Sequence, residues 1–488
     1  MGQVTQTAKR PNIVFLFTDD HAFQAISAYN HPLQLNETPN IDRIAREGML
    51  FQRCLVPNSI CAPARATILT GLYSHKNGVA DNTAKFDGSQ TTFPKLLRGS
   101  GYQTALFGKW HLQSAPTGFD AWEVLPGQGS YYNPDFITPD GTVRKPGYAT
   151  DLITDRGLQW IEARDPNKPF CLMLQHKAPH RNWMPAPRHY SLYDKTVFRE
   201  PETLFDNYSH RASPASKQAM EIDRHMTLSS DLKVPEGDTW DYLSEYKRMD
   251  TEQKAAWAKA YQGRADEFRK LQPKGKDLVR WKYQQYLKDY LRCIAAVDEN
   301  IGRVLQYLDD HDLARDTLVV YASDQGFFLG EHGWFDKRWI YEESLRTPFL
   351  ARWPGHIKPG STSDAMVSNL DFAQTFLNAA GVAAPTSMQG HSLIPVMAGK
   401  KPANWRKSFY YRYTEPGVHD VAPHEGVVTD RYKLAYFWES KEWEMYDRVK
   451  DPSEMRSVWN DPGYAKVQKD LEAELIRLRR ETGAPIMS

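Results

Sequence analysis

The hydrophobic pattern of the chain predicts a parallel sheet whose strands end in polar groups. Residues 12–18 form a continuous apolar run that stops abruptly at Asp19 and Asp20. Such a run is typical of a central strand that is buried on both faces. The other strand-sized runs that end in charged, imidazole or amide groups are residues 103–107, 170–174 and 317–322. We therefore predict an α/β fold with a mostly parallel central sheet and a site along its carboxyl edge.

Helical signals separate these runs. Residues 38–48 combine an N-terminal Thr-Pro pair, an apolar spacing near 3.6 and a glycine at the end, which predicts a helix. Residues 51–56 are expected to form a second strand, followed by a helix in the residues after Arg65. Position 61 then lies near a helix N-terminus, where the partial positive charge favours anions.

The second half of the chain predicts an insertion and a smaller domain. Residues 200–285 are polar, aromatic and charged, with a helix expected over 251–271 and a long helix over 283–308. Beyond residue 385, three short antiparallel strands (408–413, 425–429 and 432–438) precede a terminal helix at 464–482. We predict a catalytic α/β domain at 1–385 and a C-terminal α+β subdomain at 386–488.

Composition restricts the classes of protein. Lys and Arg number 61 against 60 Asp and Glu, and this balance argues against nucleic-acid binding. No apolar run is long enough to span a membrane. Residues 1–10 lack the apolar centre of a signal peptide, so we expect either an intracellular protein or a replaced leader. Four cysteines are too few for a disulfide framework, and Cys171 and Cys293 are expected to be buried thiols.

Two pairs of oxygen donors follow the first and the last of these strands. Asp19, Asp20, Asp324 and Gln325 form an all-oxygen set of the kind that Ca²⁺ accepts, and no cluster of Cys or His ligands points to zinc. A solvated loop is the ordinary interpretation of one Asp-Asp pair, but a second pair at another strand end makes it less favoured.

Cations and imidazoles also follow the predicted strands. Lys109 and His111 alternate, so both face one site if the segment is extended. A cation and an imidazole suit a tetrahedral oxyanion, one as a charge clamp and the other as a proton carrier. His180 and Lys337, the latter in an aromatic loop, are further candidates, whereas Lys177 is expected to be solvated.

Residues 59–71 carry the most specific motif, C-x-P-x-R followed by an apolar run and T-G, with its cysteine at position 61. Together with the strand-end residues, it resembles the type I sulfatases of the alkaline phosphatase superfamily. The resemblance runs from residue 12 to about 354 and is weaker beyond. Its landmarks, in family order, are residues 19–20, 38–42, 61–71, 108–111, 178–180, 324–326 and 330–333.

The resemblance implies a covalent mechanism. Cys61 becomes formylglycine through a formylglycine-generating or sulfatase-maturing enzyme, and its hydrate attacks sulfur and expels the alcohol. Ca²⁺ held by the four oxygen donors withdraws charge from the sulfate. Arg65 and Lys109 orient the nucleophile and neutralise the anion, and His111 assists collapse of the sulfated intermediate. His180 and Lys337 bind sulfate and protonate the leaving alcohol.

Two positions depart from the family pattern. Ala64 stands where many members have serine in the motif, but the modification requires the Cys, Pro and Arg. Gln325 stands where many members have asparagine, which places its amide oxygen one methylene further out.

Residues 326–346 are similar to those of glycan sulfatases, and most of all to bacterial enzymes that remove 6-O-sulfate from N-acetylglucosamine in heparan-type or mucin-type glycans. Arg338, Arg412, His419 and His424 are candidate contacts to this sulfated carbohydrate. Degradation of such extracellular glycans favours a periplasmic or secreted location, although a cytoplasmic one stays open.

Two alternatives remain open from the sequence. Relatives with the same formylglycine machinery cleave phosphonate monoesters or phosphate diesters, which differ from sulfate esters chiefly in charge. A protein that binds sulfated glycans without turnover is expected if Cys61 stays unmodified.

Overall fold

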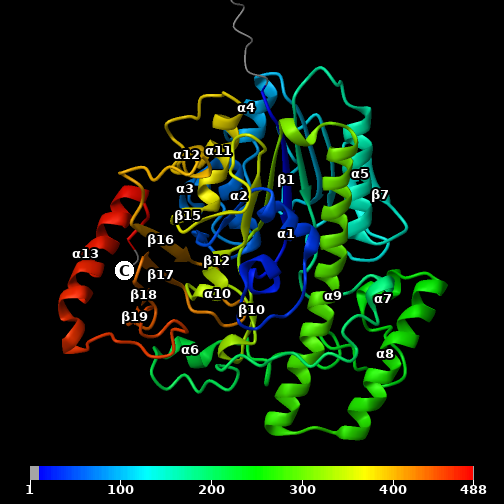
Figure 1. Cartoon of the computed structure of the whole chain (residues 1–488). Coiled ribbons are helices and arrows are strands. Elements are labelled where there is room, and N and C mark those ends of the chain that lie inside the picture. The colour runs from blue at the N-terminus through cyan, green and yellow to red at the C-terminus, as the bar shows by residue number, and fades with distance from the viewer. Residues whose placement is uncertain (1–9, 487–488) are drawn as a thin grey trace, which may run out of the picture.

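The computed structural model describes residues 10–486, and its centre is a ten-stranded mixed sheet (Figure 1). The order across the sheet is β14-β2-β13-β9-β1-β8-β4-β5-β6-β7. Strands β9, β1, β8, β4 and β5 are parallel, whereas β13 runs antiparallel to β9 and β2. The strands span β1 Asn12–Thr18, β2 Met49–Phe51, β4 Gln103–Lys109, β5 Ala121–Leu125, β6 Asp135–Thr138, β7 Gly141–Arg144, β8 Phe170–Gln175, β9 Thr317–Ser323, β13 Phe349–Arg352 and β14 Ser361–Ser363. The predicted α/β class is confirmed.

Helices cover both faces of this sheet because its central strands are apolar on both sides. Along β1, Ile13, Phe15 and Phe17 pack into one core, while Val14 and Leu16 pack into the other. The first face carries α2 Cys61–Thr70, α4 Phe93–Gly99 and α11 Phe372–Ala379, and the second carries α1 Pro39–Arg46, α5 Ala149–Ala163 and α9 Gly275–Asp310.

The predicted strand over residues 51–56 is wrong as a single element. The chain instead forms β2 in the main sheet and then β3 Cys54–Leu55 in a small separate sheet, because Gln52 and Arg53 interrupt the pairing. That sheet also holds β12 Arg346–Thr347 and β15 Val367–Ser368, and β10 Phe328–Leu329 pairs with β11 Phe335–Asp336 in another. The remaining short helices are α3 Ser74–Asn77, α10 Glu342–Leu345 and α12 Ile394–Met397.

In the region of the predicted insertion, residues 244–271 lie beside the lower half of α9, whereas residues 212–217 lie against the C-terminal part of the chain (Figure 1). This region contains α6 Pro214–Lys217, α7 Ser244–Arg248 and α8 Thr251–Leu271. Helix α8 begins at a capping box in which Asp250 and Gln253 exchange side-chain and backbone hydrogen bonds. Helix α9 starts at Gly275, eight residues earlier than its apolar pattern indicates.

The C-terminal residues form a four-stranded antiparallel sheet with α13 across it (Figure 1). Its strands are β16 Ser408–Tyr413, β17 His424–Thr429, β18 Tyr432–Phe437 and β19 Glu442–Asp447, and α13 spans Ala465–Thr482. Leu471, Leu475 and Leu478 of α13 pack against Tyr410, Val427 and Leu434 of the sheet. The α+β character of this part is confirmed, and β19 is the strand that the sequence pattern missed.

Within residues 10–486, no helix is both long enough and apolar enough to cross a bilayer.

Candidate active site

The register of two adjacent strands brings the oxygen donors together. Thr18 of β1 pairs with Ser323 of β9, so Asp19 and Asp20 follow one strand at the point where Asp324 and Gln325 follow the other. One carboxylate oxygen from each of Asp19, Asp20 and Asp324 lies within 4.8 Å of the others, and all three side chains are buried. The two sequence pairs thus form one cluster.

The carboxylates of this cluster have strongly perturbed pKa values. Burial disfavours the charge on Asp19, but Lys109, His180 and Arg65 outweigh burial and hold its pKa well below the usual range. Burial raises the pKa of Asp20 to about 7 against the attraction of Lys337, and the charges on Asp19 and Asp324 add to the rise. The pKa of Asp324 is also raised, first by burial and then by Asp19. The surroundings therefore favour the ionised form of Asp19 but disfavour the ionised forms of Asp20 and Asp324.

The donor set fits a hard divalent cation. The side-chain oxygen of Gln325 is buried and has no hydrogen-bond partner within residues 10–486, while its nitrogen donates to Asp20 at 2.5 Å. Three clustered carboxylates and one unused amide oxygen are the ligands that Ca²⁺ binds in flexible geometry. A bound cation would use that oxygen and neutralise the repulsion among the carboxylates.

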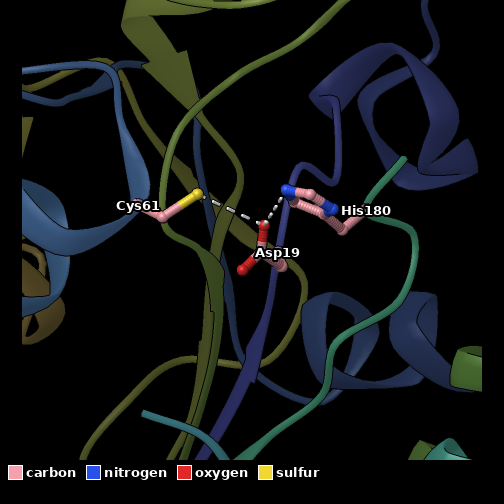
Figure 2. Close-up of side chains that lie close together, drawn as sticks. All are labelled: Asp19, Cys61 and His180. Carbon is pink, nitrogen blue, oxygen red and sulfur yellow. Dashed lines mark hydrogen bonds and ion pairs between the residues drawn. The ribbon is translucent and has the colours of Figure 1, made fainter. Parts of the chain in front are cut away.

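Cys61 is the first residue of α2 and lies beside Asp19. Its Sγ is 3.6 Å from Asp19 Oδ1 and 3.8 Å from Lys109 Nζ. Figure 2 shows Cys61 and His180 reaching the Asp19 carboxylate from opposite sides. Burial, followed by the charge on Asp19, raises the pKa of the Cys61 thiol. The unmodified side chain is therefore a neutral thiol and not a thiolate nucleophile.

Arg65 and Lys109 place positive charge on the same carboxylates. Arg65, one turn into α2, contacts Asp19 at 2.8 Å and Asp324 at 3.2 Å, and it is 2% exposed. Lys109, the last residue of β4, forms an ion pair with Asp19 and donates to Gln128 at 2.5 Å. Arg65 also donates to the carbonyl oxygen of Lys109 at 2.7 Å, so the two cations are held together.

Two further predicted residues approach the cluster from other loops. Lys337 Nζ contacts the two carboxylate oxygens of Asp20 at 2.6 and 2.7 Å. His180 Nε2 lies 3.8 Å from Asp20 and 4.0 Å from Asp19, and burial followed by the charge on Lys109 holds its pKa well below 6.5. Its other nitrogen contacts the Arg181 carbonyl at 2.5 Å.

His111 follows Lys109 by two residues and is buried. Burial, with Lys109 as the next cause, lowers its pKa to about 2, so the ring is neutral. Its Nδ1 has no hydrogen-bond partner among the described residues.

The expectation for Lys177 is wrong. Its side chain is only 3% exposed, and its ammonium group lies 4.7 Å from the centre of the Tyr131 ring. Burial lowers its pKa to about 8, and Glu245, Asp19 and Asp20 partly oppose that effect. Lys177 is part of the buried charge network around the site.

The four candidate sugar contacts separate into two groups. Arg338 and His419 both contact Asp336, the latter at 3.2 Å, next to Lys337. His424 is fully buried inside the terminal domain, where its Nε2 accepts from Ile340 N at 3.1 Å and Nδ1 contacts the Ala422 carbonyl at 2.8 Å.

Arg412 is directed away from the cluster. Its guanidinium donates to the carbonyl oxygen of Pro485 at 2.8 Å and to the hydroxyl of Tyr410 at 3.3 Å. These positions give no support to His424 and Arg412 as sugar contacts.

The sequence interpretation missed three supporting residues. Gln175 accepts from Arg65 at 2.9 Å, Gln128 accepts from Lys109, and Asn82 accepts from Ala62 N at 3.0 Å beside Cys61. Gln175 was detectable as the polar end of β8, whereas Gln128 and Asn82 lie in loops with no distinguishing pattern.

Comparison with known proteins agrees with this geometry. Residues 11–382 match the sulfatase family model, and residues 330–481 match the C-terminal model of N-sulphoglucosamine sulphohydrolase. An N-acetylglucosamine-6-O-sulfatase from Bacteroides thetaiotaomicron is 51% identical over 98% of this chain and 87% of its own length. Human N-acetylglucosamine-6-sulfatase is 28% identical over 86% of this chain and 70% of its own.

One solved structure aligns with 97% of this chain over 98% of its own chain, with 50% sequence identity and a TM-score of 0.95. That structure is a complex of its protein with the substrate D-glucosamine-2-N,6-O-disulfate. The family match covers the whole α/β core in which the strand ends gather Asp19, Asp324, Cys61 and Lys109. The chain therefore belongs to the sulfatases, the formylglycine-dependent sulfuric ester hydrolases of the alkaline phosphatase superfamily.

Proposed function

We propose that the chain hydrolyses the 6-O-sulfate of N-acetylglucosamine in glycosaminoglycan or mucin-type glycans. The observation that carries this proposal is the buried cluster in which Cys61 lies between the cation Lys109 and the carboxylate Asp19. The chain that forms this cluster is 51% identical to an N-acetylglucosamine-6-O-sulfatase. A neutral thiol has no nucleophilic use here, which supports a modified residue at this position.

We propose that Cys61 is converted to formylglycine and that Asp19, Asp20, Asp324 and Gln325 hold Ca²⁺. The modified residue would supply a hydroxyl nucleophile, and a cation held by these residues would withdraw charge from the sulfate oxygens. The fit rests on the unused oxygen of Gln325 and on the three clustered carboxylates. The maturing enzyme that oxidises Cys61 is the implied protein partner.

The charges of the chain explain how an anionic ester is accommodated. Arg65 and Lys109 lie on the Cys61 side of the cluster and neutralise the sulfate there, where burial strengthens their attraction. His180 and Lys337 lie on the opposite side, next to Asp20, in the position to give a proton to the departing alcohol oxygen. His111 is neutral and serves as the proton carrier on the Lys109 side.

We propose that Arg338 and His419 bind the hydroxyl groups of the sugar, together with Asp336. Asp336 and Arg338 are buried and His419 is half-buried, and the three form one group directly beside Lys337, which supports donors and an acceptor next to the leaving oxygen. A hydroxyl that donates to a fixed carboxylate and accepts from a guanidinium discriminates between sugar epimers. Extracellular glycans of this kind favour a periplasmic or secreted enzyme.

The test is sulfate release from positional isomers. Matured protein is given N-acetylglucosamine 6-sulfate, N-acetylglucosamine 3-sulfate, N-acetylgalactosamine 6-sulfate and an aryl phosphonate. We expect the first to be hydrolysed with the highest kcat/KM, and Cys61→Ala to hydrolyse none. Equal rates on the 3- and 6-sulfates, or a preference for the phosphonate, would exclude this proposal.

A further inference from the structure

A cavity of about 650 Å³ lies beside the proposed sulfate site, between the loop after β4 and strand β5. Its apolar lining includes Trp110, Trp122, Val124 and Leu125, and Lys85 contributes a cation. Its volume is in the range of about 300–1,000 Å³ that is usual for small-molecule sites. The roles proposed above use only one of its lining residues, His111.

Residues in the walls of the cavity adjoin residues of the proposed sulfate site. His111 lines it and is only two residues after Lys109. On one side, Gly127 lines the cavity and its neighbour Gln128 accepts from Lys109 Nζ at 2.5 Å. The loop that forms this wall therefore reaches Lys109, which contacts the proposed nucleophile.

The opposite wall is joined to Cys61. Gln113 lines the cavity and donates to the carbonyl oxygen of Asn82 at 3.4 Å. Asn82 in turn accepts from the amide of Ala62 at 3.0 Å, directly beside Cys61. Gln113 of one wall is thus linked through Asn82 to the residue after Cys61, and Gly127 of the other wall precedes a hydrogen-bond partner of Lys109.

The lining has a definite chemistry. Of the described residues that form it, none carries a carboxylate, and Lys85 is an exposed cation at the surface. Trp122 is half-buried and presents an indole surface, on which the apolar face of a pyranose stacks. An aromatic cavity with a cation at its edge and no carboxylate matches an anionic sugar.

We propose that this cavity binds the sugar joined to the sulfated residue, and that this neighbour is an anionic pyranose recognised by Trp122 and Lys85. The inference rests on the proposed function, since it names what else of the glycan the enzyme holds. Trp122 stacks on the ring, and Lys85 pairs with its carboxylate or sulfate. The enzyme therefore acts better on a chain than on the single sulfated sugar.

The experiment compares a monosaccharide with a disaccharide. Wild type, Trp122→Ala, Lys85→Gln and the control Trp443→Ala, a half-buried tryptophan of β19, are assayed on N-acetylglucosamine 6-sulfate alone and joined to a uronate. We expect Trp122→Ala to lower kcat/KM for the disaccharide about tenfold, the loss of one stacking contact of about 1.4 kcal/mol. Its kcat/KM for the monosaccharide stays within about twofold, a difference well under 1 kcal/mol.

Lys85→Gln tests the role of the charge without disturbing the fold, because this exposed side chain supports no packing. Lys85→Gln should lower kcat/KM for the uronate disaccharide but not for the disaccharide in which the uronate carboxylate is reduced to an alcohol. A third disaccharide, in which that reduced neighbouring sugar carries a sulfate, distinguishes recognition of a sulfate from recognition of a carboxylate. Equal losses on monosaccharide and disaccharide, or no preference of wild type for the disaccharide, would overturn the proposal.

Binding of the desulfated disaccharides, measured by calorimetry, needs no turnover. If wild type hydrolyses no 6-sulfate but binds the uronate disaccharide in a Trp122-dependent way, the proposed function fails and the cavity assignment stands. If wild type binds the uronate disaccharide no tighter than N-acetylglucosamine, the cavity assignment fails.

Discussion

Removal of calcium is expected to destabilise the folded protein measurably. Asp19, Asp20 and Asp324 are buried within 4.8 Å of one another, and the pKa of Asp20 is raised to about 7 by burial and by the two neighbouring carboxylates. A divalent cation relieves this repulsion in the folded chain alone, because unfolding disperses the carboxylates. Binding to the folded state shifts the unfolding equilibrium by mass action.

The magnitude follows from linkage and from chain length. A cation present at about a hundred times its dissociation constant adds about 2.7 kcal/mol to the free energy of unfolding. For 488 residues, an unfolding entropy of about 2.1 cal/mol/K per residue gives about 1 kcal/mol/K. Chelation should therefore lower the melting temperature by about 3 °C in scanning calorimetry. Magnesium should restore less, because it requires stricter octahedral geometry.

A matched pair of variants assigns this effect to the site. Gln325→Leu removes the unpartnered amide oxygen and leaves the three carboxylates in place, so the calcium-dependent shift should fall to half or less. Gln374→Leu is the control, since Gln374 is also a buried glutamine with unpartnered amide atoms but lies on α11. Identical melting with calcium and with chelator in wild type, or a full shift in Gln325→Leu, would refute the reasoning.

Three further substitutions test the local structure. Arg65→Ala removes one of the two cations that contact the buried Asp19 carboxylate, and it should cost about 3–5 kcal/mol in urea unfolding. A cost below about 1 kcal/mol would contradict the buried pairing. Gly108 has a φ of +112°, and Gly108→Ala would place a Cβ 2.0 Å from a carbonyl oxygen of β8. Circular dichroism should therefore show a far greater loss of folded structure for Gly108→Ala than for Gly127→Ala, whose Cβ would meet open space. Burial lowers the pKa of His424 to about 4, so the free energy of unfolding falls as the pH drops from about 6.5 to 4. In urea titrations, His424→Gln should reduce the stability lost between about pH 7 and 5 by about 2 kcal/mol. The same loss of stability in wild type and variant would contradict a neutral buried ring.

The centre of the fold and the site could both be predicted from the sequence because both follow from the buried apolar strands of the central sheet. Strands buried on both faces must be continuously apolar, so the first polar residues after them mark the sheet edge. The ends of β1 and β9 brought Asp19 and Asp324 together in this way. The motif at Cys61 was detectable because its spacing is specific, and α2 begins at that residue.

Other parts depend on contacts that no local pattern records. Lys177 is polar in sequence but buried beside Tyr131 because the loop after β8 folds inward. Strand β19 was missed because Glu442 and Glu444 interrupt its apolar character, although Glu444 is buried and accepts from the hydroxyl of Tyr341 at 2.7 Å. Arg412 sits on a correctly predicted strand, but its guanidinium donates to the carbonyl oxygen of Pro485, a partner that lies far away in the sequence, beyond α13.

The most direct test of the central claim relates conversion of Cys61 to catalysis. The protein is prepared with graded amounts of a sulfatase-maturing enzyme, and peptide mass spectrometry measures the fraction of Cys61 that has lost about 18 Da on becoming the aldehyde. We predict that kcat on N-acetylglucosamine 6-sulfate rises in proportion to that fraction and reaches zero where no Cys61 is converted. Full activity in unmodified protein, or none in fully converted protein, would contradict the account.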